Sequence, residues 1–118
     1  PDGFRWCETG TLSMKISQSD EYGFGRPWVV KNKKKQFELF YSVRRKSVSA
    51  YRLGYATSDD GVNWERKDNQ LGLDVSKNSF DSDAIMYSSI INCHGSTYCF
   101  YNGNDFGKDG IALAILEQ

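Results

Sequence analysis

The sequence lacks the features that would place it among membrane or nucleic-acid-binding proteins. No apolar run approaches the roughly 18 residues that a helix needs to cross a bilayer. Fifteen Lys and Arg residues balance fifteen Asp and Glu residues, so no net charge attracts nucleic acid or an anionic membrane. We interpret the basic run at residues 31–35 as a solvated turn rather than a phosphate-binding patch. Neither nucleic acid nor a membrane is therefore expected as a partner.

Cysteine and histidine are also scarce, which removes several kinds of site. Cys7, Cys93 and Cys99 lack CxxC spacing, although the last two can face each other across a hairpin. We expect free thiols, which slightly favour a reducing, cytoplasmic compartment. The single histidine, His94, lies in an expected turn, so a Ser-His-Asp triad or a histidine-bound metal is not expected. No zinc motif or P-loop occurs, and we predict neither a metal nor a cofactor.

The sequence does contain a series of short segments typical of β-strands. Segment 36–44 (QFELFYSVR) is apolar at Phe37, Leu39 and Tyr41, which is the period of a strand. No stretch of ten or more residues has helical periodicity. The pattern predicts an all-β fold of strands joined by hairpins. Three further segments are rich in strand-forming residues or polar with a tryptophan anchor: 26–32, 50–58 and 62–68.

The motif DGxxW occurs twice, at residues 2–6 (DGFRW) and 60–64 (DGVNW). Asp-Gly is a strong hairpin signal, because glycine readily adopts the positive φ that a type I′ turn requires. The second copy follows the strand expected at residues 50–58. It is therefore predicted to turn the chain into an outer strand, in which Trp64 packs against the neighbouring strands.

The same order of segments recurs after some 60 residues, which indicates an internal repeat. Tyr101 answers Tyr41 at an offset of 60 residues, and Gly110 answers Gly54 at an offset of 56. Four-stranded antiparallel units that repeat at such spacings are typical of β-propeller blades. The segments that correspond to 26–32, 36–44 and the end of 50–58 are 83–91, 97–104 and 110–117.

We accordingly predict about two four-stranded antiparallel propeller blades. Two blades do not close a ring, and open blade edges favour association with other chains. A longer parent chain, self-association and a compact β-sandwich are the three outcomes that satisfy this constraint, and we favour the first. The predicted division is 1–25 for the outer strand of a preceding blade and a connection, 26–68 for a complete blade, 69–82 for a connection and 83–118 for most of the next blade.

Two stretches carry a resemblance to a known superfamily: GYATSDDGVNW at residues 54–64 and YNGNDFGKDGIALA at residues 101–114. They resemble blades of the five-bladed propeller glycoside hydrolases, the arabinanase, levansucrase and invertase superfamily of family 43 and family 32 types. The resemblance covers residues 1 to 117 and about two of five blades. It implies a glycan-active protein, a glycoside hydrolase that acts with paired carboxylates in a central funnel. A sialidase propeller fits less well, because Ser58–Trp64 lacks one spacer residue of the sialidase Asp-box.

The resemblance also implies where a site would lie. Relatives carry an acidic residue, often Glu, at the start of an inner strand, and Asp83 occupies that place. Asp83 is therefore the predicted catalytic residue, although Asp is one methylene shorter than Glu. Glu21 and Tyr22 are expected at the funnel rim. The residues predicted to contact substrate are Arg26, Trp28, Asp81, Tyr87, Asn102 and Asn104.

Each of these residues also has a structural interpretation. Arg26 can bind a sugar hydroxyl or form an internal ion pair, and Trp28 can stack on a sugar or pack in the core. Asn102 and Asn104 suit turns, and Asp83 can cap a strand. If those interpretations hold, the chain is a non-catalytic carbohydrate-binding or scaffold propeller. Because one carboxylate cannot be both acid and base, we expect no hydrolysis from an isolated monomer of this chain.

Overall fold

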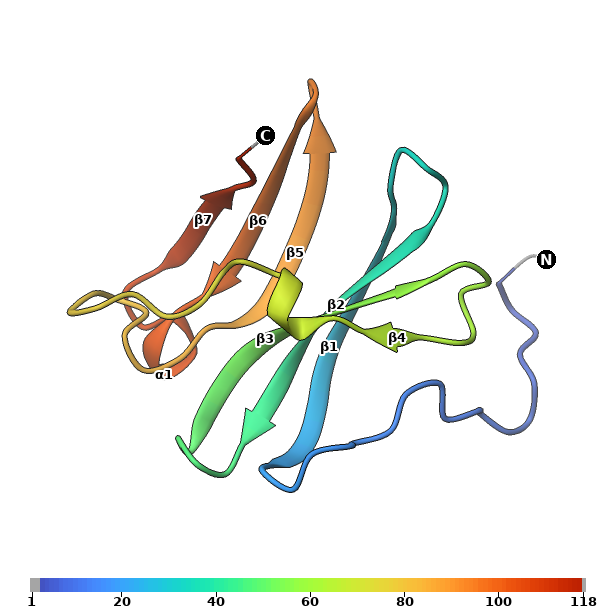
Figure 1. Cartoon of the computed structure of the whole chain (residues 1–118), viewed down its shortest axis with the longest axis horizontal. Helices are drawn as coiled ribbons and strands as arrows, with labels where there is room; N and C mark the ends of the chain where they lie inside the picture. The colour runs from blue at the N-terminus through green and yellow to red at the C-terminus, as the bar shows by residue number, and fades with distance from the viewer. Residues whose placement is uncertain (1–2, 118) are drawn as a thin grey trace.

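The structure is a computed structural model that describes residues 3–117, and it contains two antiparallel sheets with almost no helix (Figure 1). The sheets have the strand orders β1-β2-β3-β4 and β5-β6-β7, each following the order of the chain. The all-β prediction is confirmed, and neither sheet closes on itself. The strands are β1 Glu21–Lys31, β2 Phe37–Arg45, β3 Ala50–Ser58, β4 Glu65–Arg66, β5 Met86–Cys93, β6 Ser96–Asn102 and β7 Ile111–Ile115. The short helical segments are η1 Asp68–Gln70 and α1 Asn104–Gly107.

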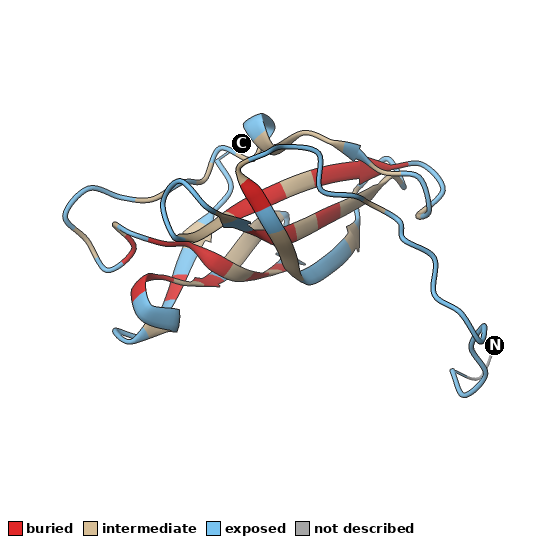
Figure 2. Ribbon diagram, turned by 90° about the horizontal axis from the view of Figure 1, so that it is seen from below, coloured by how far each residue is buried: buried red, intermediate tan, exposed pale blue. Residues whose placement is uncertain are grey.

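The molecule has two hydrophobic cores, and the alternating apolar residues of β2 form most of the first. Leu39, Tyr41 and Val43 are buried on one face of the first sheet, where Met14 and Trp64 pack against them. A second cluster joins the two sheets. Figure 2 shows that most buried residues lie within the strands, with others just before β5 and at α1, whereas the segment before β1 is largely exposed. The second cluster consists of Leu53, Ile85, Tyr101 and Ala112.

The second DGxxW motif forms the connection between β3 and β4, as predicted, but with a different turn. The carboxylate of Asp60 accepts hydrogen bonds from the backbone N–H groups of Val62 (2.8 Å) and Asn63 (2.7 Å). Gly61 has a φ of 77°, whereas Asp60 has no positive φ, so the expected type I′ turn is wrong here. A two-residue turn with positive φ at both positions occurs instead at His94-Gly95, between β5 and β6.

The first DGxxW motif begins at Asp2, which lies outside the described residues. Residues 3–20 contain no strand, and Trp6 is 85% exposed. The inner strands were expected to start at residues 26 and 83, whereas β1 starts at Glu21 and β5 at Met86. The division of the chain into blade segments stays a prediction.

Cross-strand register corrects two details of the sequence analysis. Tyr41 lies opposite Gly54, whereas Tyr101 lies opposite Ala112 rather than Gly110. Within β5 and β6, Cys99 lies opposite Ile90 rather than Cys93, and all three cysteines are free thiols.

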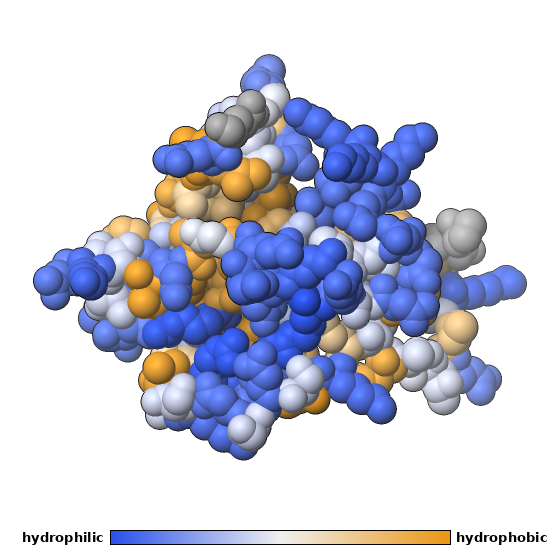
Figure 3. All heavy atoms as spheres, in the orientation of Figure 1, coloured by the Kyte–Doolittle hydropathy of each residue, from blue (hydrophilic) through white to orange (hydrophobic). Residues whose placement is uncertain are grey.

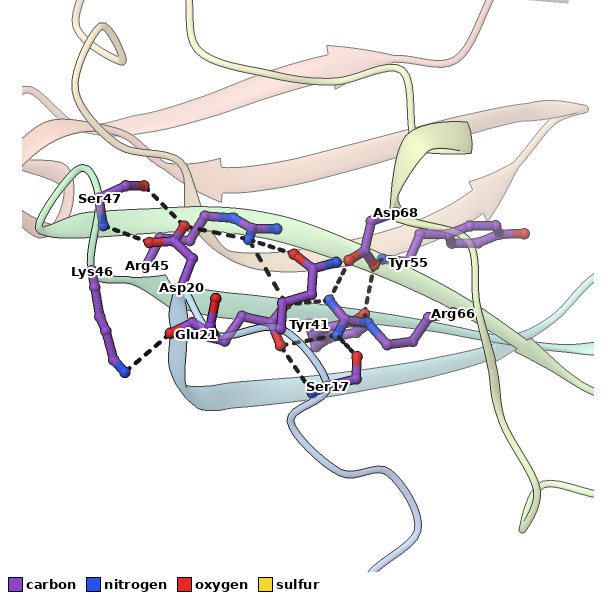
Figure 4. Close-up of polar contacts among 12 residues, drawn as sticks. Ser17, Asp20, Glu21, Tyr41, Arg45, Lys46, Ser47, Tyr55, Arg66 and Asp68 are labelled. Atoms are coloured by element: carbon purple, nitrogen blue, oxygen red, sulfur yellow. Dashed lines mark hydrogen bonds and ion pairs between the residues drawn. The ribbon is translucent and has the colours of Figure 1, made fainter.

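A polar lock made of Glu21, Tyr41, Arg66 and Asp68 spans the first sheet, because it joins residues of β1, β2, β4 and η1 (Figure 4). The Arg66 guanidinium pairs with Glu21 at 2.6 Å and with the Asp68 carboxylate, and it donates to the Tyr41 hydroxyl at 2.9 Å. Burial alone would raise the pKa of Glu21, but hydrogen bonding and charge from Arg66 outweigh it and lower the pKa. Because every charge in the lock has a partner, we assign it a structural role.

Both first strands contain a bulge at an equivalent place. The register slips between Gly25 and Trp28 in β1 and between Met86 and Ser89 in β5. Within these bulges Arg26 has a φ of 48° and Tyr87 a φ of 59°. Positive φ is uncommon for residues other than glycine and costs energy, so a strained backbone at matching positions is a feature that function can explain.

The two sheets are linked where these bulges meet. The backbone N–H of Tyr87 donates to Ser42 Oγ at 2.8 Å, and Arg26 donates to Ser89 Oγ at 3.4 Å. The first strand of the second sheet, β5, therefore packs against both β1 and β2 (Figure 1). Among residues 3–117, no helix has the length and apolarity required to cross a bilayer.

Candidate functional site

The candidate site lies at the end of the molecule where β1, β3 and β5 begin and β2 ends. Five side chains gather there, and we call them the aromatic cluster: Tyr22, Arg44, Tyr51, Tyr87 and Phe106.

Ring distances define the arrangement of this cluster. The Tyr51 ring centroid lies 5.6 Å from that of Tyr87 and 6.1 Å from that of Phe106. Tyr87 and Phe106 are stacked, with centroids 6.2 Å apart. The Arg44 guanidinium carbon lies 4.4 Å from the centroid of Tyr22 and 6.0 Å from that of Tyr51. The arrangement provides aromatic faces and one cation on a partly exposed surface.

The hairpin between β2 and β3 places Arg44 and Tyr51 next to each other. They lie directly opposite in the β2–β3 register, so their side chains project from the same face. Gly23 lies opposite Arg44 on β1, and a Cβ at that position would come within 3.1 Å of Arg44 Cδ. The absence of a side chain at Gly23 therefore lets Arg44 lie across the sheet towards Tyr22.

Phe106 joins the cluster through an unusual turn. Asp105 and Phe106 have φ values of 49° and 56°, in the left-handed region that most side chains avoid. Phe106 is 64% exposed, so burial does not account for its position. The Asn102 side chain donates to the Phe106 carbonyl at 3.5 Å and thereby supports this turn. A strained turn that presents an exposed aromatic ring is consistent with a binding surface.

One tyrosine of the cluster, Tyr87, has a pKa that its surroundings raise above the ordinary value. Hydrogen bonding with Tyr51, followed by burial, raises the pKa of Tyr87, and the nearby Arg44 charge opposes this only in part. The hydroxyl of Tyr87 is therefore available as a hydrogen-bond donor and acceptor. Such amphipathic groups suit a ligand with both apolar faces and hydroxyls.

Asp83 lies just before β5 with its backbone fixed and its carboxylate exposed. Its N–H donates to Asn104 Oδ1 at 2.8 Å, and its carbonyl accepts from Arg52 at 2.8 Å. The carboxylate itself accepts one long hydrogen bond, from Ser82 Oγ at 3.3 Å. The pKa of Lys108 is raised chiefly by Asp105, with a smaller contribution from Asp83. Asp83 is thus presented to solvent beside α1.

Three of the residues predicted to contact substrate instead make structural contacts within the fold. Asp81 is 1% exposed and accepts from the Tyr101 hydroxyl at 2.8 Å. Asn104 is buried, and its amide binds the backbone and side chains of loop 79–84 through both its oxygen and its nitrogen. Trp28 donates from Nε1 to the Ile90 carbonyl at 3.0 Å and so joins the sheets. We leave these three out of the proposed ligand site.

The structure therefore brings Tyr87 into the aromatic cluster, with Arg26 at the adjacent bulge and Asp83 before the same strand. Sequence reasoning missed Arg44, Tyr51 and Phe106. The short turn at residues 46–49 was a usable signal, because it places Arg44 opposite Tyr51. No group of three or more His, Cys, Asp or Glu within residues 3–117 is placed to hold a metal ion.

A second concave region lies at the other end of the molecule. This groove has a volume of about 630 Å³ and is lined mainly by apolar side chains from both sheets, including Phe40, Leu71, Leu73, Ile90 and Leu116. Figure 3 shows apolar side chains gathered between the second sheet and the connection that precedes it. The exposed Glu117 borders the groove, but the strained residues Arg26 and Tyr87 do not line it.

Comparison with known proteins gives two kinds of match. No protein-family model matches the chain. Two curated relatives, the uncharacterized proteins Rv1502 and MT1551 of Mycobacterium tuberculosis strains H37Rv and CDC 1551, are each 33% identical over 117 residues. The match covers 99% of this chain and 38% of each relative, so the chain spans well under half the length of the relatives it matches.

The structural matches identify the kind of fold. A solved structure named "Glycoside hydrolase" has a TM-score of 0.60 and 26% identity, covering 80% of this chain and 27% of the matched chain. A second solved structure, described as a complex of BT0996 and RGII, has a TM-score of 0.60 and 27% identity over the same shares. The chain therefore has a glycoside hydrolase-like fold, in agreement with the coarser part of the resemblance seen in the sequence.

Proposed function

We propose that this chain is part of a glycan-active protein, a glycoside hydrolase of the five-bladed propeller class, and that its two sheets are adjacent blades. The meandering strand orders, the neighbouring first strands β1 and β5 and their matching bulges support the blade assignment. The share of the curated relatives that the chain spans, 38%, is close to two blades of five.

The observation that carries the proposal is the aromatic cluster at the strand-start end of a glycoside hydrolase-like fold. Sugar rings present apolar C–H faces and hydroxyl edges. Tyrosine supplies an apolar face and a polar tip on one side chain, and it loses little conformational freedom on binding. Tyr51, Tyr87 and Phe106 offer such faces within about one sugar ring of each other. We propose that they form one subsite for a glycan.

Asp83 is the proposed general acid of the hydrolase. Its carboxylate is exposed and lies just before β5, the first strand of the second sheet. Hydrolysis of a glycosidic bond uses a second carboxylate, which sits about 5 Å from the acid in retaining enzymes and about 6.5–9.5 Å away in inverting ones. Glu21 is committed to the polar lock, and Asp81 is buried against Tyr101. Asp105 is paired with Lys108. We propose that the second carboxylate comes from outside residues 3–117.

A non-catalytic carbohydrate-binding or scaffold propeller is the alternative. The observation in its favour is that Asp, shorter than Glu, stands at the strand start and is held there by backbone contacts. In that case the aromatic cluster would bind glycan without turnover, and Asp83 would serve only to shape the loop.

Binding and turnover by the full-length native protein separate these alternatives. We expect Tyr51→Ala and Tyr87→Ala each to weaken binding of a recognised oligosaccharide at least tenfold by calorimetry. Tyr98→Ala is the matched control, because Tyr98 lies on β6 at the other end of the sheet and should leave affinity unchanged. Asp83→Asn should abolish hydrolysis while preserving affinity. Binding that survives both cluster substitutions would contradict the proposed subsite, and unaltered turnover in Asp83→Asn would exclude Asp83 as the acid.

A further inference from the structure

The arginines of the first sheet fall into two groups. Three are paired with carboxylates: Arg45 with Asp20 and Glu21, Arg52 with Asp74, and Arg66 with Glu21 and Asp68. The other two, Arg26 and Arg44, have no carboxylate partner within the part of the chain that the structure describes. Both are exposed, and both lie at the candidate site.

We propose that the site recognises a sugar that carries an anionic group, a carboxylate or a phosphate, and that Arg44 binds this group. The inference rests on the proposed function, because it names the class of glycan that the aromatic cluster would accept. Planar guanidinium groups bind carboxylate and phosphate through two parallel N–H donors, which gives them both strength and orientation.

The position of Arg44 is set before any ligand binds. Its guanidinium lies over the Tyr22 ring at 4.4 Å, and its aliphatic stem crosses the open space at Gly23. Stacking on a ring uses the face of the guanidinium and leaves its N–H edge free. A preorganised donor edge loses less freedom on binding than a mobile side chain would.

The surrounding charges favour an anion at Arg44 rather than elsewhere on this surface. Asp105 is paired with Lys108 at 3.1 Å, and Asp83 also interacts with the Lys108 charge. The negative groups therefore gather around α1 with their own cation. Arg44 lies instead among neutral aromatic rings, where its charge is not offset by a nearby carboxylate.

Arg26 provides a second, weaker donor. Its guanidinium makes one long hydrogen bond, to Ser89 Oγ at 3.4 Å, and its backbone is strained at a φ of 48°. The bulge directs this side chain out of the regular alternation of β1. We assign Arg26 a supporting contact to the same anionic sugar or to its neighbour.

The test compares matched glycans on the full-length native protein. The probes are an oligosaccharide of uronic acid units, the same oligosaccharide with its carboxyls reduced to alcohols, and a sugar phosphate. We expect the uronate or the phosphate to bind at least tenfold more tightly than the neutral oligosaccharide. Added salt should reduce this preference, because it screens the charge of an exposed arginine.

Variants then show which arginine causes the tighter binding of the charged probes. Arg44→Gln should remove this preference for the charged probe, and Arg44→Lys should retain only part of it, because lysine lacks the planar fork. Arg26→Gln should reduce it by a smaller factor. Arg5→Gln is the control with the same loss of charge, since Arg5 is exposed in the segment before β1, and it should change nothing.

The outcomes separate the inference of an anionic sugar from the proposed function on which it rests. Tighter binding of the uronate supports a carboxylated sugar, and tighter binding of the phosphate supports a phosphorylated one. Equal binding of charged and neutral probes, or a preference that persists in both Arg44→Gln and Arg26→Gln, overturns the inference and leaves the proposed function intact. Failure of every glycan to bind overturns both. Circular dichroism of each variant establishes that it is folded before its affinity is compared.

Discussion

The two sheets solve the same packing problem with different chemistry. Each has a buried tyrosine on its second strand, Tyr41 or Tyr101, whose hydroxyl donates to an aspartate. In the first sheet that aspartate is Asp68, which also binds the Tyr55 N–H and Arg66. In the second it is Asp81, and one of its two carboxylate oxygens is buried with no hydrogen-bond partner.

This difference shows that the first sheet is fastened by a polar network and the second by a single contact. The network in the first sheet uses the strand β4 and the segment η1 that follows it. Within the described residues the second sheet ends at β7 and has no fourth strand. Two halves with similar strand order therefore have different sensitivities to substitution.

The largest expected effect breaks the polar lock itself. Arg66→Met leaves the fully buried Glu21 side chain without its closest cation, and we expect a loss of about 3 kcal/mol in the free energy of unfolding. Urea denaturation followed by tryptophan fluorescence measures this loss. Lys67→Met is the control, because its partner Glu65 is largely exposed and the pair should contribute less than about 1 kcal/mol. Equal effects of the two substitutions would contradict the lock.

The two tyrosines provide a direct comparison of the sheets. Tyr101→Phe leaves the Asp81 carboxylate buried without a side-chain donor, and we expect a cost of about 2–3 kcal/mol. Tyr41→Phe should cost less, about 1 kcal/mol, because Asp68 keeps its bonds to Tyr55 and Arg66. Unfolding midpoints of the two variants in the same buffer decide the order. A larger cost for Tyr41→Phe would reverse the comparison.

The residues that face these tyrosines differ in size, and exchanging them sharpens the contrast. A Cβ on Gly54 would lie 2.4 Å from the Tyr41 ring, so Gly54→Ala should destabilise the first sheet by about 1–3 kcal/mol. The second sheet already accommodates alanine opposite its own buried tyrosine, at Ala112 facing Tyr101. Ala112→Gly should therefore cost only about 0.5–1 kcal/mol, through backbone entropy. Thermal unfolding of the two variants provides the measurement, and a harmless Gly54→Ala would show that the Tyr41 ring moves freely.

The smallest effect is the pH dependence of the first sheet. The pKa of Glu21 is lowered from its ordinary value of 4.5, so the folded chain holds this carboxylate ionised more strongly than the unfolded chain does. The resulting stability is fully present above pH 4.5 and is lost as the pH falls through the lower, folded-state pKa. We expect urea midpoints to fall between pH 6 and pH 3, and to fall less in Glu21→Gln. Glu8→Gln, in the exposed segment before β1, should keep the original slope.

The strands could be predicted from the sequence, whereas the candidate site could not. Alternation at Leu39 and Tyr41, together with the Asp60-Gly61 turn, predicted the strand order of the first sheet correctly. These signals are local, because side-chain period and turn chemistry act over a few residues. They locate the ends of a strand only loosely, so the expected starts of β1 and β5 differ from the observed ones by three to five residues.

The aromatic cluster depends on contacts between segments that are distant in the chain. Tyr51 meets Phe106 across 55 residues, and Phe106 reaches it through a left-handed turn that no local pattern announces. Asn104 looked like a ligand contact because of its Y-N-G-N context, but its amide is used by loop 79–84. Which of two polar roles an asparagine takes is decided by the neighbours that the fold brings to it.

The arrangement of Arg66 has a further consequence for how this chain tolerates sequence change. One guanidinium joins residues from three separate segments, at Ser17 and Glu21, at Tyr41 and at Asp68. Substitutions at these positions therefore share a partner, and their effects on stability will not add. Once Arg66 is lost, replacing Glu21 by an apolar residue removes a buried charge that keeps only the longer contact with Arg45, so a change that is harmful alone becomes less harmful in combination. Divergence at these positions is consequently expected to proceed by paired replacements rather than by independent ones.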